Sequence, residues 1–570
     1  MRILFLTHSF NSLAQRLYLE LTRRGHEVSI EFDINDAVTA QAVDMYCPDL
    51  IVAPFLKRAI PKEIWKNHVC LVVHPGIVGD RGPSALDWAI MHDVPEWGVT
   101  VLQASGEMDA GDIWAAKTFP MRLARKSSLY RNEVTEAAVR AVLLAVERFQ
   151  SGNFRSIPLD YSNPEVRGQL HAPIRQADRV IDWQRDDTLT VLKMIHAADG
   201  FPGVLDTLCG EAYYLFEACA EGTLRGEPGA ILAKRNGAIC RATVDGAVWI
   251  GHLKRKSEAE PSLKLPATLL LSNHLAEVPE ASLDPFSPCT GETYRDIWLE
   301  QKNSVGYLHF DFYNGAMSSE QCERLREAYL AATQRDVRVI VLMGGADFWS
   351  NGIHLNCIEA AASQADESWN NINAMDDLAR AIITTNTQLT IAALQGNAGA
   401  GGVFLSLAAD RVYAREGVVL NPHYKGMGNL YGSEYWTYLL PRRVGTERAV
   451  TLTQNRLPVG SAQAQEMGLI DSCFGAGRED FLARVEQIAE GLAASPDYPA
   501  LLREKNARRE RDEREKSLDA YRDEELQHMK LNFYGFDPSY HVARYNFVYK
   551  IPYAWTPLYL ARHRRAVRLA

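Results

Sequence analysis

Short apolar runs alternate with amphipathic stretches over the first part of the chain. Ile3–Leu6, Leu50–Ala53 and Cys70–Val73 are continuously apolar, which is typical of parallel strands buried on both faces. Leu13–Arg24, which follows the first of these runs, has apolar residues at helical spacing. This alternation predicts an open α/β sheet of parallel type over residues 1–165.

The pattern changes further along the chain. Short strand-like runs between glycine-rich turns predict a small β-barrel over residues 166–262. Residues 263–300 contain several prolines and lack a hydrophobic period, so they are predicted to be a linker. Strand-like and helical runs alternate again over residues 301–500, which predicts a second α/β domain. In the extension 501–570, a charge-dense part is predicted to be a solvated helix, and the aromatic part after it is predicted to pack on the body.

Composition narrows the class of protein. The chain has 570 residues, of which 47% are hydrophobic, as in an ordinary soluble protein of several domains. Its formal net charge of −10 argues against nucleic acid as the main partner. No apolar run approaches the roughly 20 residues of a membrane span, and the opening run turns polar at Thr7, too early for a signal peptide. The nine cysteines are scattered without a CxxC pair, so no disulfide framework and no metal site is predicted, and a reducing cytoplasm is expected.

A first candidate site follows the strand that ends near Val73. His74 comes directly after this strand, and ligands of open α/β sheets bind at the carboxyl ends of strands. A lone histidine is usually structural. Here, however, the turn Arg81–Ser84, a predicted helix over Leu86–His92 and the acidic turn Met108–Asp112 follow it. These features resemble the folate-dependent formyltransferases, especially methionyl-tRNA formyltransferase, and the predicted barrel resembles the C-terminal domain of that family.

The resemblance implies formyl transfer from 10-formyltetrahydrofolate, with His74 and Asp109 as the catalytic pair. The chemistry agrees, because a histidine oriented by a carboxylate can assist both the oxyanion and the proton transfer that attack on a formyl group requires. The family's asparagine is Val72 here, which cannot donate a hydrogen bond. Either another donor replaces it, or the acceptor is a better nucleophile than an amine, such as a thiol. The resemblance also implies cofactor contacts at Ser9, Asn11, Phe55, Leu56 and Asp112.

A second candidate site consists of two glycine-rich turns, Phe348–Leu355 and Gln395–Gly402. Neither turn fits the dinucleotide-binding or the P-loop pattern. Together they resemble the crotonase (enoyl-CoA hydratase/isomerase) superfamily, which implies a ββα spiral fold and a coenzyme A thioester as ligand. The resemblance further implies an oxyanion hole made by the N–H groups of Ile353 and Gly401, where a backbone without Cβ atoms can approach the ligand.

The two catalytic glutamates of the hydratases are missing, because their positions fall at Phe404 and Pro422. The candidate replacements are Tyr424, after the strand that normally carries a carboxylate, and Glu434, predicted to begin the next helix. Burial in this apolar stretch would raise the pKa of Glu434 toward a useful range. The alternative for Glu434 is a helix-start residue favoured by the macrodipole. His354, which follows Ile353, could point into the site as well, and the alternative for it is structural packing.

The combination of both modules resembles a family of nickel-iron hydrogenase maturation proteins over nearly the whole chain. It implies that formyl passes to coenzyme A and that formyl-CoA is decarbonylated to CO, the ligand of the hydrogenase iron, with hydrogenase maturation proteins as candidate partners. Two alternatives stay open. One is formyl transfer combined with an isomerase or hydrolase reaction on another acyl-CoA, and the other is a non-catalytic carrier for hydrogenase assembly.

Overall fold

The computed structural model describes residues 1–258, 261–288 and 291–565, and the chain divides into two compact units. Unit 1 comprises Met1–Glu258, Pro266–Pro279 and Pro552–Ala570, and unit 2 comprises Ala259–Leu265 and Glu280–Ile551. Each unit therefore contains segments that are far apart in the sequence. Within the described residues, every helix is too short or too polar to span a bilayer.

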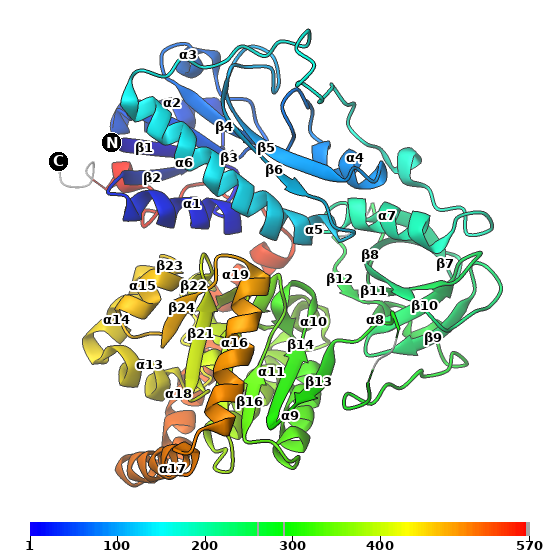
Figure 1. Ribbon diagram of the computed structural model, residues 1–570, viewed down its shortest axis with the longest axis vertical. Coiled ribbons are helices and arrows are strands. Elements are labelled where there is room, and N and C mark those ends of the chain that lie inside the picture. The colour runs from blue at the N-terminus through cyan, green and yellow to red at the C-terminus, as the bar shows by residue number, and fades with distance from the viewer. Residues whose placement is uncertain (259–260, 289–290, 566–570) are drawn as a thin grey trace. The chain divides into compact units, whose positions relative to one another are not determined.

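A six-stranded sheet forms the first part of unit 1, in the order β2-β1-β3-β4-β5-β6 (Figure 1). The first four strands of the chain pair in parallel, whereas β5 and β6 are antiparallel, so the sheet is mixed. Helices α1 and α6 lie side by side against it. The bounds are β1 (Arg2–Thr7), β2 (Glu27–Phe32), β3 (Leu50–Phe55), β4 (Cys70–His74), β5 (Glu96–Gln103), β6 (Ile113–Pro120), α1 (Ser12–Arg23), α2 (Asp36–Tyr46), α3 (Lys62–Trp65), α4 (Ala85–Met91), α5 (Lys126–Leu129) and α6 (Thr135–Ser151).

The second part of unit 1 is an antiparallel sheet in the order β7-β8-β11-β10-β9, against which α7 packs. The bounds are α7 (Thr188–Ala198), β7 (Val204–Leu208), β8 (Glu211–Glu221), β9 (Ile231–Arg235), β10 (Ala238–Ala242) and β11 (Ala247–Arg255). Part of the predicted linker belongs here, since α8 (Ala267–Leu270) and the turn after it bury Leu271 and Leu275 in the barrel core. Residues 266–279 are thus not a free linker, because their apolar side chains complete this core.

Unit 2 is built on a six-stranded sheet in the order β13-β14-β16-β19-β21-β24, parallel from β14 onward. Side chains of β16 alternate between two cores: Ile340 and Leu342 pack with α9 and α11, whereas Val339 and Val341 pack with α16. Both faces of the sheet are therefore covered, which accounts for the continuously apolar strands. Figure 1 shows α16 lying across these strands. The bounds are β13 (Ile297–Lys302), β14 (Val305–Phe310), β16 (Val339–Leu342), β19 (Leu389–Leu394), β21 (Arg411–Arg415), β24 (Ser472–Phe474), α9 (Ser319–Thr333), α11 (Gln364–Ile383) and α16 (Arg478–Ala494).

Smaller elements carry the turns beyond this sheet. The strands β17, β20, β22 and β23 form a second sheet, and β15 pairs with β18. Their bounds are β15 (Ala316–Met317), β17 (Phe348–Ser350), β18 (Gly352–Ile353), β20 (Asn397–Gly399), β22 (Val419–Asn421) and β23 (Val459–Gly460). The helices nearby are α10 (Leu355–Ala360), α12 (Gly401–Leu407), α13 (Trp436–Val444), α14 (Thr446–Asn455) and α15 (Ser461–Glu466).

The C-terminal extension is divided between the units. Helices α17 (Tyr498–Glu515), α18 (Leu518–Tyr534) and α19 (Ser539–Val548) belong to unit 2, whose core includes Met529, Phe533 and Tyr540. The segment after residue 551 packs in unit 1, where the N–H of Ile30 donates to the carbonyl of Leu560 over 3.1 Å. The predicted packing of the aromatic part thus involves both units, and residues 566–570 lie outside the described residues.

Candidate functional site

His74 is the last residue of β4, and its buried imidazole lies beside two carboxylates. Its Nε2 is 2.8 Å from Oδ2 of Asp80, and its Nδ1 is 3.5 Å from Oδ2 of Asp109. Asp109 is held in turn by the N–H of Gly82, which donates to its Oδ2 over 3.1 Å. The structure brings the predicted residues His74 and Asp109 together. It also places Asp80, which the sequence pattern did not indicate, beside the imidazole.

The shorter contact determines what His74 can do. Asp80 is only 1% exposed, and its second oxygen lies 3.0 Å from Nδ1 of His171. Because a carboxylate can only accept, the neutral imidazole carries its proton on Nε2, toward Asp80. Nδ1 then has a free electron pair that can accept a proton from an attacking group. Asp80 is therefore the carboxylate that orients the ring, whereas Asp109 lies on the Nδ1 side.

The predicted cofactor contacts in β3 and the first loop lie near one another. The hydroxyl of Thr7 is 3.0 Å from the carbonyl oxygen of Ser9 and 3.1 Å from that of Phe55. Asn11 is the N-cap of α1, and its Oδ1 accepts from the N–H of Ala14 over 3.0 Å. The first loop and the end of β3 thus lie together at the carboxyl ends of β1 and β3.

The remaining predicted contacts have structural partners. Leu56 and Val72 both pack against the same apolar core of unit 1. Val72 therefore contributes to the apolar core at the position where the formyltransferases have an asparagine. Asp112 accepts a hydrogen bond from Ser156 over 2.8 Å, and the described contacts do not join it to His74.

The two glycine-rich turns of unit 2 meet at Gly352 and Gly401. Gly352 has a left-handed φ of 78°, and a Cβ there would lie 3.3 Å from the backbone nitrogen of Gly401. Gly401 is the first residue of α12, where N–H groups have no partner within the helix. Ile353 directly follows Gly352. The N–H groups of Ile353 and Gly401 therefore come from adjoining turns, the arrangement that an oxyanion hole requires.

The carboxyl group of Glu434 stands directly against this turn. A Cβ on Gly401 would lie 2.1 Å from Oε1 of Glu434, whose side chain is buried. The hydroxyl of Tyr424 donates to Oε2 of Glu434 and also lies 3.0 Å from the carbonyl of Ser433. The predicted tyrosine–glutamate pair is thus assembled beside the predicted oxyanion hole.

Glu434 does not begin a helix, contrary to the prediction from sequence. Helix α13 starts at Trp436, and both Glu434 and Tyr435 have a left-handed φ of 58°. For residues other than glycine this conformation costs about 1–3 kcal/mol each, so surrounding contacts must hold it. The alternative, an ordinary helix-start residue, does not account for this backbone.

Burial controls the protonation of the pair. Burial, with the nearby charge of Asp376, raises the pKa of Glu434 to about 8, and burial also raises the pKa of Tyr424 well above its ordinary value. When Glu434 is protonated, it can donate to Tyr424, which then donates to the carbonyl of Ser433. When Glu434 is ionised, Tyr424 donates to the carboxylate. The pair can therefore gain or lose a proton without leaving a buried donor unpaired.

The positions of the missing glutamates are apolar. Phe404 is fully buried and stacks on Tyr424, with ring centroids 5.2 Å apart and planes 20° from parallel. Pro422 is buried as well. His354 caps α10, since its Nδ1 accepts from the N–H of Cys357 over 3.2 Å. This contact agrees with the packing alternative for His354.

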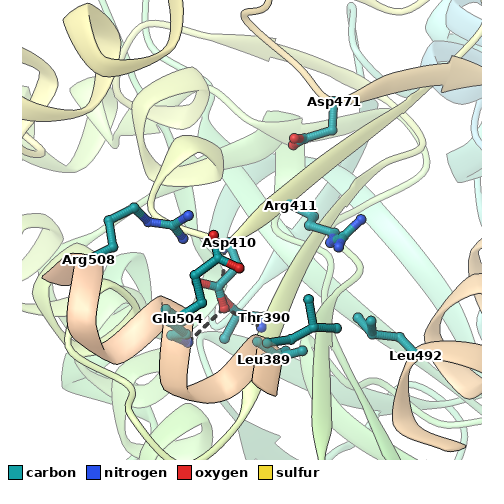
Figure 2. A pocket seen from close by; sticks show the side chains of 10 residues that line it. Leu389, Thr390, Asp410, Arg411, Asp471, Leu492, Glu504 and Arg508 are labelled. Atoms are coloured by element: carbon teal, nitrogen blue, oxygen red, sulfur yellow. Dashed lines mark hydrogen bonds and ion pairs between the residues drawn. The ribbon is translucent and has the colours of Figure 1, made fainter. Parts of the chain in front are cut away.

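Two cavities in unit 2, of about 320 and 310 Å³, lie at the amino ends of the strands, away from the two glycine-rich turns. Figure 2 shows the first, lined by Leu389 at the start of β19, Arg411 at the start of β21, and Glu504 and Arg508 of α17. Gly401 instead follows the carboxyl end of β19. The candidate site therefore occupies the end of the sheet where α/β proteins bind ligands, and the cavities occupy the other end.

The fold and the two sites define a chain with a formyltransferase part and a crotonase part. Comparison with known families agrees: the family described as formyl transferase matches residues 31–146, the formyl transferase C-terminal domain matches residues 173–264, and enoyl-CoA hydratase/isomerase matches residues 300–533. Both resemblances expected from the sequence motifs are thereby confirmed.

The chain belongs to the family of the hydrogenase maturation factor HoxX. It is 55% identical to the factor of that name from Bradyrhizobium diazoefficiens over 566 residues, which cover 99% of this chain and 97% of that protein. The crystal structure of HypX from Aquifex aeolicus in complex with tetrahydrofolic acid matches with a TM-score of 0.96 and 51% identity, covering 99% of each chain. Methionyl-tRNA formyltransferase from Ralstonia pickettii is 25% identical over 256 residues, which are 44% of this chain and 74% of that protein.

Proposed function

We propose that the chain makes carbon monoxide for the iron centre of a nickel-iron hydrogenase. Formyl passes from 10-formyltetrahydrofolate to coenzyme A in unit 1, and formyl-CoA is decarbonylated to CO and coenzyme A in unit 2. The HoxX family membership supports the hydrogenase context, and the relative crystallised with tetrahydrofolic acid supports the folate. On this proposal the chain acts in the cytoplasm, with hydrogenase maturation proteins as partners.

The proposal for the second step, the decarbonylation in unit 2, rests on one observation. The buried pair Tyr424–Glu434 stands against Gly401 in a crotonase fold whose usual glutamate positions are apolar. Such a site is suited to polarise a thioester and to move a proton. It lacks the carboxylates that would direct water to the substrate, as in a hydratase.

In the first step, Nδ1 of His74 takes the proton of the attacking thiol, and Asp109 stabilises the imidazolium that forms. The imidazolium then gives this proton to N10 of the folate as the bond between N10 and the formyl carbon breaks, which leaves tetrahydrofolate and formyl-CoA. Asp80 keeps the ring in the required orientation. A thiol ionises near pH 8.5, so its attack depends less on the missing asparagine than the attack of an amine would. The apolar side chains of Phe55 and Leu56 contact the folate ring, and the polar groups of Ser9, Asn11 and Asp112 contact the substrates. These last assignments rest on the formyltransferase resemblance.

In the second step, the N–H groups of Ile353 and Gly401 hold the thioester oxygen. Glu434 removes the formyl hydrogen as a proton, and the electron pair of that C–H bond becomes the lone pair on the carbon of CO. The electrons of the C–S bond leave with sulfur, which receives a proton through Tyr424. Atoms and electrons balance without an oxidant. Water must be kept out, because hydrolysis to formate competes.

The overall proposal is tested with purified protein, 10-formyltetrahydrofolate and coenzyme A, using haemoglobin to trap CO. CO formation that depends on both substrates is expected. Formyl transfer without CO, together with turnover of another acyl-CoA, would indicate the isomerase or hydrolase alternative. Binding without any turnover would indicate the non-catalytic carrier.

The assignment of the second site is tested by supplying formyl-CoA directly. Glu434→Gln and Tyr424→Phe should each lower CO formation by about 10²–10⁴-fold, the usual effect of losing an acid–base group. Binding of coenzyme A should persist, because neither change removes the oxyanion hole. Unchanged CO output in both variants would show that decarbonylation uses other groups.

A further inference from the structure

Two other buried carboxylates hold the backbone that carries Glu434. Asp376 of α11 and Glu525 of α18 are both fully buried. Oδ1 of Asp376 accepts from the N–H of Glu434 over 2.8 Å, and Oε2 of Glu525 accepts from the N–H of Tyr435 over 3.0 Å. Glu434 and Tyr435 are the two residues of this segment that have left-handed backbone. The two carboxylates therefore bind the peptide groups whose conformation is least favourable.

The flanking residues extend the same network. The hydroxyl of Ser433 lies 2.9 Å from Oδ2 of Asp376 and 3.2 Å from Oε2 of Glu525. At the other end, the N–H of Thr437 donates to Oε1 of Glu525 over 2.8 Å, and the hydroxyl of Thr437 contacts the same oxygen. Both ends of the five-residue segment Ser433–Thr437 are thus fixed to carboxylates from two distant helices.

This network exceeds what a helix cap needs. A helix N-terminus is normally capped by one Ser, Thr, Asp or Asn side chain. Here two buried carboxylates converge on the start of α13, and a third carboxyl group, that of Glu434, lies among them. Burying several acidic groups together is unfavourable unless they are well paired, and such clusters are concentrated at functional sites.

We propose that Asp376 and Glu525 are positioning residues for decarbonylation: they hold Ser433–Thr437 in the conformation that sets the carboxyl group of Glu434 against Gly401. This role rests on the proposed function of Glu434 as the base. Helices α11 and α18 are thereby part of the second site, although neither carries a residue that we assign to the reacting atoms.

The charges of the network also act on Glu434. Burial raises the pKa of Asp376 to about 6 and that of Glu525 to about 8. Asp376 stays the more acidic because Nε of Arg522 lies 3.8 Å from its Oδ2. At neutral pH the negative charge of the cluster is then mainly on Asp376, which makes the carboxylate of Glu434 a stronger base. The titratable and charged groups that face this cluster are Tyr424, Tyr431, Tyr435, Cys322 of α9, Asp377 of α11 and Arg522 of α18.

The decisive variant is Asp376→Asn in the full-length protein. The amide oxygen can still accept from the N–H of Glu434, and the hydroxyl of Ser433 keeps Glu525 as an acceptor, so the main change is the loss of the charge. With formyl-CoA as substrate, kcat and KM for CO are measured between about pH 6 and pH 9. The midpoint at which kcat rises with pH should move down by about one unit, because a like charge beside Glu434 is lost. KM should stay within about twofold of the wild-type value, since the thioester contacts are unchanged.

Removing the acceptors themselves tests the positioning. Asp376→Ala and Glu525→Ala should each lower kcat by about 10–100-fold, the effect of a small misplacement of a catalytic group. Glu525→Gln keeps one amide oxygen as an acceptor and should recover part of that loss. The control is Asp523→Asn, on the exposed face of α18, which should change neither kcat nor the pH midpoint.

The outcomes separate this inference from the proposed function. If Glu434→Gln abolishes CO while Asp376→Ala and Glu525→Ala match the Asp523→Asn control, the positioning role is overturned and the proposed function stands. If Glu434→Gln leaves CO unchanged, both fail. Should the Asp376 variants not fold, Glu525→Ala and Glu525→Gln decide by the same comparison of kcat with the Asp523→Asn control. A loss in Glu525→Ala that Glu525→Gln partly recovers supports the positioning role, and control-like rates in both overturn it.

Discussion

At the scale of single residues, His74 lies between two carboxylates at unequal distances. The nearer one, Asp80, is the more buried, so it restricts the ring, whereas Asp109 lies beside Nδ1, the nitrogen that we propose as the base. We predict that His74→Ala lowers formyl transfer to coenzyme A by about 10²–10⁴-fold. Asp80→Asn should lower it by about 10–100-fold, because an amide can bind either tautomer and orients the ring less strictly.

The measurement is the rate of formyl-CoA formation, with circular dichroism to show that each variant folds. Asp44→Asn, on an exposed position of α2, serves as the control and should retain the wild-type rate. Near-normal turnover in a folded His74→Ala protein would remove the histidine from the mechanism. An Asp80→Asn variant as active as the control would show that the ring is oriented by other contacts.

The protonation of Glu434 predicts how the second step depends on pH. Its pKa is raised to about 8, so the carboxylate needed to remove the formyl proton is the minor form at pH 7. As pH rises toward 8 this form becomes more populated, and CO formation from formyl-CoA should increase and then level off. A rate that falls with pH over the same range would show that the protonated carboxyl group is the active form.

At the scale of elements, a buried ion pair docks α17 onto the strand ends beside the cavity of Figure 2. Nζ of Lys505 donates to the carbonyl of Gln388 and to Oδ2 of Asp410, both over 2.7 Å. Thr390 also binds Asp410, so this charge stays in place when the lysine is removed. Because a buried charge is then left unpaired, Lys505→Met should lower the free energy of unfolding by about 3 kcal/mol.

Urea denaturation of the two proteins tests this. Lys530→Met, at an exposed position of α18, is the matched control and should change stability by less than about 0.5 kcal/mol. Adding Asp410→Asn to Lys505→Met should recover part of the loss, since no charge then remains buried. Equal stability of the Lys505 and Lys530 variants would show that apolar contacts alone hold the helix.

At the scale of the whole molecule, the end of the chain ties the formyltransferase part to the helices of unit 2. Glu31 in β2 is bound by His563 over 2.8 Å and by Arg564 over 2.7 Å, and Thr556 also donates to it. Burial alone would raise the pKa of Glu31, but these hydrogen bonds lower it overall, so it stays charged and paired. Leu560 is buried in the same segment.

This tie predicts that the chain survives cleavage between its units. With a protease site inserted between Pro279 and Glu280, where the chain passes from unit 1 to unit 2, the two fragments should still elute together in size-exclusion chromatography, because the C-terminal fragment remains bound to β2. Glu31→Ala should weaken the association, and Glu27→Ala, exposed on the same strand, should not. Separation of the wild-type fragments after cleavage would show that the terminal segment does not hold them.

The helices and strands, and the residues that could carry local chemistry, were predictable from the amino-acid sequence. Continuously apolar runs predicted β1, β3 and β4, and the spacing of two glycine-rich turns predicted where a backbone would approach a ligand. His74 and Tyr424 could be proposed as site residues because each stands at or shortly after the end of a strand, whereas Glu434 was proposed as the start of a helix that in fact begins at Trp436. Local pattern suffices for such residues, since periodicity and backbone conformation are properties of neighbours in the chain.

Which acidic residues are buried could be seen only in the three-dimensional structure. Asp80 stands six positions after His74, a proximity that offered a weak signal, but Asp376 lies in an ordinary helix and Glu525 in a charge-dense run expected to be solvated. An acidic residue looks the same in a sequence whether water or other carboxylates surround it. Its burial and its raised pKa arise only when helices distant in the chain close around the segment Ser433–Thr437, because desolvation and charge interactions depend on neighbours in space.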